Sequence, residues 1–166
     1  MRALTLVFLA VATAAAAEPT LVTIPGKGWH FLIDVPPVRT SEGQYDGERF
    51  RYLATSPSGI TFSLHTESAE GGGNELCRDT YWEKGSKNPV IAEGTVEFFE
   101  AKHLLGVSHK SEGDYQGKHF TTANAHGYFV QGSDCIDLHV SIVGYTEEKR
   151  DIAEEIVKSS AIIPVE

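Results

Sequence analysis

The stretch CIDLHVSIVGYTEEKRDIAEEIVKSSAII, residues 135–163, decides the fold, because one uninterrupted run holds a strand, a helix and the start of a further strand. Its first part predicts a strand, since apolar and polar side chains alternate as they do when one face of a sheet is buried. The apolar positions are Ile136, Leu138, Val140 and Ile142, and the polar positions are Asp137, His139 and Ser141. The register of this strand is therefore well specified.

The second part of the stretch predicts an amphipathic helix that begins after Thr146. Thr146 can cap this helix, and the acidic pair at residues 147–148 suits its positive end. Helical spacing predicts that one stripe of side chains is buried. The stripe consists of Ile152, Ala153, Ile156, Val157 and Ser160, and residues 162–164 (IIP) then predict a short terminal strand.

The earlier strands are predicted from β-forming residues bounded by turn signals. Residues 29–35 (WHFLIDV) stop at a Pro-Pro pair, and residues 50–55 and 60–66 make a hairpin around Ser-Pro-Ser-Gly. Residues 118–130 turn through Gly-Ser-Asp into the strand at 135–143. Residues 96–109 fit a helix as well as two short strands, and we favour the strands.

A second helix is predicted over residues 75–84, between a triple-glycine loop and Gly85. Asn74 stands where an N-cap belongs. The helical spacing directs Cys77 inward, toward the strand that carries Cys135.

The order of these predicted strands and helices indicates one α+β domain over residues 18–166, with an antiparallel sheet packed against helices. The early segment GWHFLIDVP, a hairpin, a helix, an antiparallel run and the closing stretch at 135–163 together resemble the PsbP/Mog1-like fold. The resemblance implies a sandwich of that kind. It also implies an adaptable interaction or assembly-factor scaffold, usually without catalysis.

Residues 1–17 predict an export signal, because Arg2 precedes an apolar run that ends in small residues before Glu18. The run is shorter than the roughly 20 residues that a spanning helix needs. We expect cleavage after residue 17, no stable membrane span afterwards, and a periplasmic or secreted product.

The charge of the chain disfavours nucleic acid as a partner. The formal net charge is −9, and the longest basic run is the pair Lys149-Arg150. Binding to a phosphate backbone needs clustered cations.

Two cysteines are present, Cys77 and Cys135, and export carries both into an oxidising compartment. The chain contains no Cys-x-x-Cys motif, which would indicate redox chemistry. We therefore predict one structural disulfide, which closes a loop of about 60 residues and is worth about 4 kcal/mol in the chain-entropy model.

Asp137, His139 and Ser141 suggest a hydrolytic triad at first sight, since they project from one face of one strand. Neighbours of this kind lie about 7 Å apart along a strand, whereas a nucleophile and its base must reach hydrogen-bonding distance. The chain also lacks a G-x-S-x-G elbow. We predict that the protein is not an enzyme and needs no cofactor.

Seven histidines are numerous for this length, yet none shows a metal-ligand spacing such as H-x-H. A metal site would have to be assembled across neighbouring strands. The candidate ligands are His65, His126 and His139, with Asp137 as a fourth. The alternative is a set of half-exposed imidazoles bonded to polar neighbours.

The sequence thus favours an exported, non-enzymatic interaction or assembly module that acts on a protein or envelope partner. The alternative function is binding of a small ligand or a divalent metal by the histidine-bearing face of the sheet.

Overall fold

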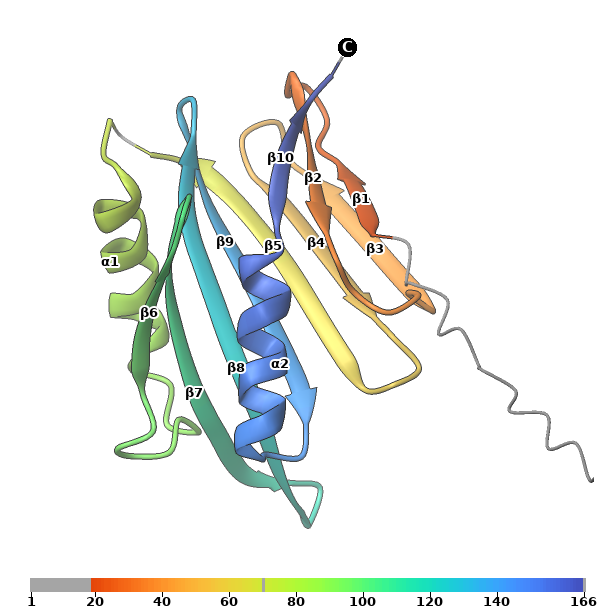
Figure 1. Cartoon of the computed structure of the whole chain (residues 1–166), viewed down its shortest axis with the longest axis vertical. Coiled ribbons are helices and arrows are strands. Elements are labelled where there is room, and N and C mark those ends of the chain that lie inside the picture. The colour runs from red at the N-terminus through yellow and green to blue at the C-terminus, as the bar shows by residue number, and fades with distance from the viewer. Residues whose placement is uncertain (1–18, 70, 166) are drawn as a thin grey trace, which may run out of the picture.

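The protein, described by a computed structural model over residues 19–69 and 71–165, is an α+β structure of two antiparallel sheets and two helices (Figure 1). The predicted signal segment lies outside the described residues. A seven-stranded sheet has the order β3-β4-β5-β9-β8-β7-β6, and a three-stranded sheet has the order β1-β2-β10. The large sheet comprises β3 (Thr40–Tyr45), β4 (Phe50–Thr55), β5 (Ile60–Ser68), β6 (Glu97–Ala101), β7 (Leu104–Tyr115), β8 (Lys118–Gln131) and β9 (Asp134–Val143). The small sheet comprises β1 (Thr20–Thr23), β2 (Trp29–Ile33) and β10 (Ala161–Pro164), and the helices are α1 (Asn74–Gly85) and α2 (Glu147–Lys158).

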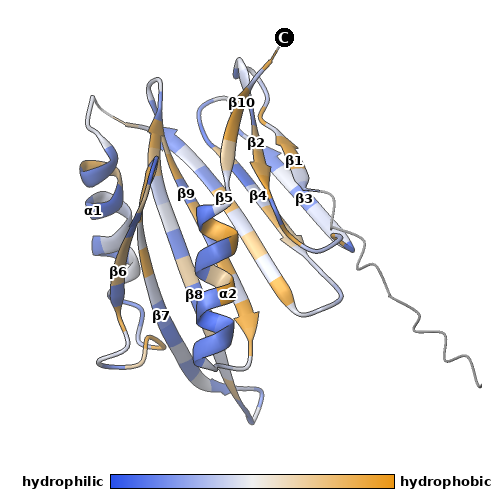
Figure 2. Ribbon diagram, in the orientation of Figure 1, coloured by the Kyte–Doolittle hydropathy of each residue, from blue (hydrophilic) through white to orange (hydrophobic). Residues whose placement is uncertain are grey.

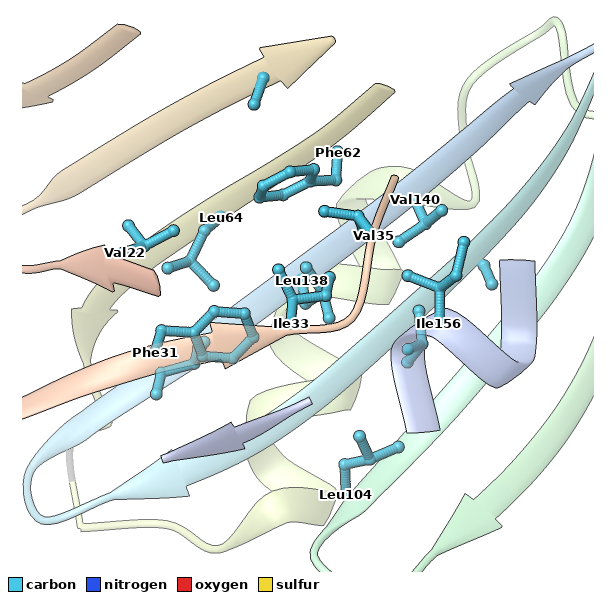
Figure 3. Packing of buried hydrophobic residues seen from close by; sticks show 14 of the residues in the cluster. Val22, Phe31, Ile33, Val35, Phe62, Leu64, Leu104, Leu138, Val140 and Ile156 are labelled. Carbon is cyan, nitrogen blue, oxygen red and sulfur yellow. The ribbon is translucent and has the colours of Figure 1, made fainter. Parts of the chain in front are cut away.

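The main core lies between one face of the large sheet and a layer made of α2 and the small sheet. The alternating apolar residues of β9 point into this core, as the sequence predicted. Figure 3 shows Leu138 and Val140 of β9 packed with Ile33 of β2 and Ile156 of α2. Hydrophilic residues cover much of the outward side of α2 (Figure 2). Burial of this apolar face fixes α2 on the sheet.

The other face of the large sheet carries α1 and a smaller core. Cys77, Val107, Tyr128 and Cys135 are buried there, with the half-buried Tyr81 and Trp82 packed against them. Since side chains alternate along a strand, the odd-numbered residues of β9 point to this side. The polar face of β9 is therefore the face that α1 partly covers.

Two short strands were missed by the sequence analysis. Every residue of β3 is exposed, so no alternation of apolar and polar side chains marks it. β1 has only four residues and pairs with β2 over its whole length. Residues 96–109 do form strands, and the second of them extends to Tyr115.

Two predictions about helix positions were wrong. Gly73, not Asn74, is the N-cap of α1, and no side chain caps the helix. The amide of Asn74 instead accepts from the backbone N–H of Val130 at 2.9 Å and donates to the carbonyl oxygen of His103 at 3.0 Å. Ile152 is 42% exposed because the contact of α2 with the sheet is centred on Ala153, Ile156 and Val157.

Candidate functional site: a charged pocket beside a histidine-bearing sheet face

The predicted disulfide is present and joins α1 to the start of β9. Cys77 and Cys135 are each 4% exposed, and their Cα atoms lie 5.5 Å apart. The bond closes a loop with a sequence separation of 58 residues. It therefore holds the helix against the sheet at one fixed point.

A pocket of about 640 Å³ lies against this disulfide, and we call it the charged pocket. One wall is α1, and the others are the end of β5, the turn between β8 and β9, and two neighbouring hairpin turns. Its charged lining residues are Lys27, Glu48, Arg49, Glu67, Lys84 and Asp134. The pocket is thus built from five segments that are spread over residues 27–135.

Only part of this charge is neutralised within the pocket. Lys27 and Asp134 form an ion pair of 2.7 Å, which links the β1–β2 turn to β9. Across residues 19–69 and 71–165, no ion pair involves Arg49, Lys84 or Glu67. Burial, followed by the nearby Glu67 carboxylate, raises the pKa of Tyr81. The pocket therefore offers cations and a carboxylate to a ligand.

The floor of the charged pocket continues along β5 and β9 into the histidine-bearing face. Glu67 and His65 lie two residues apart on β5, and Cys135 and Asp137 lie two residues apart on β9. Each pair therefore projects to the same side of the sheet. The pocket and the predicted histidine site are parts of one surface beside α1.

The structure brings the four predicted ligand residues onto three adjoining strands. His65 stands opposite Asp137, and His126 stands opposite His139. The rings of His126 and His139 are parallel, with their centroids 4.1 Å apart. His126 Nδ1 lies 3.3 Å from Asp137 Oδ1, and His139 Nε2 lies 3.1 Å from Asn124 Oδ1. The contacts of Asp137 and His139 thus run across to β8 rather than along β9 to Ser141.

His109 and Trp82 complete the cluster, and the sequence analysis did not assign either to it. The ring of His109 lies 5.6 Å from that of His126, and the Trp82 ring lies within 6 Å of both, at 5.7 and 5.9 Å. His109 belongs to the segment whose structure the sequence left open. Its spacing of two from Val107 places it on this face only once the segment is known to be a strand.

Burial favours the neutral imidazole of three histidines on this face, His109, His126 and His139, because it lowers the pKa of each. Desolvation, and then the charge of His109, lowers the pKa of His126 to about 3. Desolvation also lowers the pKa of His139 and of His109. The same cause raises the pKa of Asp137 to about 6. The contact between His126 and Asp137 is therefore a hydrogen bond from a neutral imidazole to a carboxylate, not an ion pair.

Neutral imidazoles are the form that binds metal, but the ring arrangement is not that of a ligand set. The nitrogen lone pairs lie in the ring planes, so parallel stacked rings direct them along parallel planes and not to one point. Across residues 19–69 and 71–165, no group of three or more His, Cys, Asp or Glu side chains is placed to hold a metal ion. Metal binding there stays a prediction and requires at least one ring to rotate.

Within residues 19–69 and 71–165, no helix combines the length and apolar character that crossing a membrane requires.

Comparisons with known proteins assign no family. No protein-family model matches the chain, and no curated protein matches it. Among solved structures, a protein from Bacteroides thetaiotaomicron VPI-5482 matches with 12% identity and a TM-score of 0.49, over 89% of this chain and 48% of its own. The chain thus spans about half the length of that protein. LpqN, involved in cell envelope biogenesis of Mycobacterium tuberculosis, matches with 12% identity and a TM-score of 0.43, over 91% of this chain and 87% of its own. Neither structure is identified as a PsbP/Mog1-like protein, so that resemblance remains a prediction.

Proposed function

We propose that the chain is an exported, non-enzymatic binding module that engages a protein or envelope partner through the charged pocket. The observation that carries this proposal is a pocket of about 640 Å³ with both cations and carboxylates in its lining. Among residues 19–69 and 71–165, the one ion pair of this lining joins Lys27 to Asp134. Charged groups left without a partner in a concave site are available for recognition.

The construction of the pocket supports a binding role, because its walls are fixed before a partner arrives. The disulfide holds α1 to β9, and the Lys27–Asp134 pair holds a hairpin turn to the same strand. The Asn74 side chain ties the first turn of α1 to β8 and to the residue before β7. A preformed site loses less conformational entropy on binding.

The disulfide also supports export. A buried disulfide persists in oxidising compartments and is rare in the cytosol. Together with the apolar segment at residues 1–17, it favours the periplasm or the exterior as the place where the module acts.

Photo-crosslinking tests the pocket directly. A benzoylphenylalanine placed at Thr80, an exposed pocket residue on α1, should give one discrete adduct in the native envelope fraction. The same probe at Lys118, the exposed first residue of β8 and no part of the pocket lining, should not give that adduct.

Charge-reversing substitutions inside and outside the pocket test whether the pocket's cations are needed for the adduct. Arg49→Glu with Lys84→Glu should abolish the Thr80 adduct, because it removes two of the pocket's cations. Lys102→Glu with Lys118→Glu changes the net charge equally at exposed sites outside the pocket and should leave the adduct intact. Equal adducts from all these proteins would contradict the proposal.

Divalent-metal binding by His65, His126, His139 and Asp137 is the second candidate function. The observation in its favour is that four potential ligands share one face of three neighbouring strands. Calorimetry with zinc, copper and nickel should show saturable binding that His139→Ala removes and that His119→Ala, at an exposed histidine, does not. Because the pKa of His126 and of His139 is lowered, proton competition should begin below pH 6.5. No saturable binding at micromolar metal would exclude this candidate.

A further inference from the structure

A second concave surface lies on the opposite side of the large sheet, between α2 and the segment that follows β2. Its volume is about 640 Å³, and we call it the acidic groove. Its apolar part is formed by Ile152 and Ile156, and its charged lining residues are Asp34, Glu148, Asp151 and Glu155. All four charged side chains are carboxylates, and no lining residue is cationic.

Ile152 is the solvent-exposed apolar side chain of this groove. It is 42% exposed, while Ile156 beside it is 8% exposed and packs into the main core. The sequence places Ile152 on the apolar stripe of α2, but the fold does not cover it. An aliphatic side chain exposed in a groove gains free energy when a second apolar group covers it.

Ser159 connects the two walls of the groove. The hydroxyl of Ser159 donates to the carbonyl oxygen of Ile156 at 2.7 Å and accepts from the backbone N–H of Asp34 at 3.3 Å. The second of these bonds joins the end of α2 to the segment after β2. The two walls are thus in contact without a partner.

Cations outside the groove neutralise only two of the four carboxylates. Lys158 lies 3.1 Å from Glu155, and Arg150 lies 3.5 Å from Asp151. Asp34 and Glu148 form no ion pair within residues 19–69 and 71–165, and they lie on different walls. Two unpaired carboxylates therefore flank an exposed aliphatic side chain.

We infer that the acidic groove docks a basic segment of a partner protein, in which an aliphatic side chain covers Ile152 and flanking Lys or Arg side chains pair with Asp34 and Glu148. Charge complementarity selects this occupant. A second copy of the chain fits less well, because each copy carries a net charge of −9 and like charges repel.

A synthetic peptide with one central leucine between two pairs of lysines is the probe. Labelled with fluorescein, it should bind the full chain saturably in an anisotropy titration, and the affinity should fall as salt is raised. A peptide with glycine in place of the leucine should bind about fivefold more weakly, since the covered apolar area is lost. A peptide with glutamates in place of the lysines should not bind.

Substitutions in the acidic groove test whether the peptide binds there. Asp34→Lys with Glu148→Lys should weaken binding at least about tenfold, as two opposite charges near the ligand become like charges. Glu42→Lys with Glu93→Lys makes the same change in net charge at exposed positions that do not line the groove, and should weaken binding less than about threefold. Ile152→Ser leaves the net charge unchanged and should weaken binding about fivefold.

Three results would overturn the inference. Equal losses in the two charge-reversed proteins would show that the peptide follows the net charge and not the groove. Unchanged affinity in Ile152→Ser, with circular dichroism confirming the fold, would remove the apolar anchor. Concentration-dependent dimers in sedimentation that Asp34→Lys with Glu148→Lys abolishes would assign the groove to a second copy.

Discussion

His126 lies at the centre of the histidine cluster, where its ring contacts those of His139, His109, Tyr128 and Trp82. Burial by these rings makes protonation of the imidazole unfavourable. The buried Asp137 beside it responds in the opposite sense, because burial favours the protonated, neutral carboxyl group. The side chains of this face therefore link the stability of the fold to pH.

On acidification the buried histidines lower the free energy of unfolding, and Asp137 opposes them. Between about pH 3 and 6.5 the unfolded chain binds a proton at His126 that the folded chain does not, so acidification reduces the free energy of unfolding. His139 and His109 act in the same direction, because the pKa of each is lowered on folding. Asp137 acts oppositely between its ordinary pKa of 3.8 and about 6, where the folded chain binds the extra proton.

We therefore expect His126→Gln to flatten the dependence of unfolding free energy on pH between 4 and 6.5, by up to about 1.4 kcal/mol per pH unit. Asp137→Asn should steepen it, because the opposing carboxyl group is removed. Urea unfolding at several pH values measures both slopes. A slope in His126→Gln equal to that of the wild type would contradict burial of this imidazole.

At the scale of elements, α1 is held to the large sheet by the disulfide, by the Asn74 amide and by the packing of Tyr81 and Trp82. We expect Cys77→Ala with Cys135→Ala to lower the free energy of unfolding by about 2–4 kcal/mol, mainly because the unfolded chain regains loop entropy. Binding at the acidic groove should survive, since α2 packs on the other face.

Mass spectrometry without reduction checks the bond itself, and should find peptides containing Cys77 and Cys135 linked to each other. Two freely alkylated thiols in the exported protein would contradict it.

The packing of α2 on β8 depends on Gly127. A Cβ atom at this position would lie 2.6 Å from Val157 Cγ1 and 3.3 Å from Leu104 Cδ2. We expect Gly127→Ala to destabilise the fold by about 1–3 kcal/mol, since a packed core does not accept the extra methyl group. Gly28→Ala is the control, because nothing lies within 4 Å of its added methyl.

Adding Val157→Ala to Gly127→Ala should restore part of the lost stability, because it removes the atom that the new methyl meets. Urea unfolding of the two single variants and the double variant measures this coupling. Strict additivity of the two losses would show that the close approach is relieved elsewhere.

At the scale of the whole molecule, the two proposed binding surfaces lie on opposite faces of one sheet. The charged pocket lies on the side of α1, and the acidic groove lies on the side of α2. If both proposals hold, a partner at one surface therefore leaves the other surface open.

Export is a prediction about the whole chain. We expect the mature protein to begin at Glu18, because the small residues at 15–17 form a signal-peptidase site. Amino-terminal sequencing of the protein recovered outside the cytoplasm measures this. Recovery of a chain that begins at Met1 in a membrane pellet would contradict the prediction.

Local signals in the sequence determined much of the fold. The alternation in β9, the Thr146 cap and the Ser-Pro-Ser-Gly turn each act within a few residues, so their elements could be predicted. The exposed β3 could not, because it is held by pairing with β4 and carries no pattern of its own. Cys77 and Cys135 were predictable as a pair because only two cysteines exist.

The sites depend on distances that only the tertiary structure decides. The sequence placed His126 and His139 on strands, but stacking of their rings requires β8 and β9 to pair in one particular register. The charged pocket and the acidic groove each join segments separated by more than 100 residues, such as Lys27 with Asp134 and Asp34 with Ser159. The sequence by itself thus determined the α+β class, most strands and the disulfide, because short-range patterning and cysteine pairing suffice for these. The charged pocket and the acidic groove were decided by the tertiary structure, because convergence of distant side chains leaves no periodic trace along the chain.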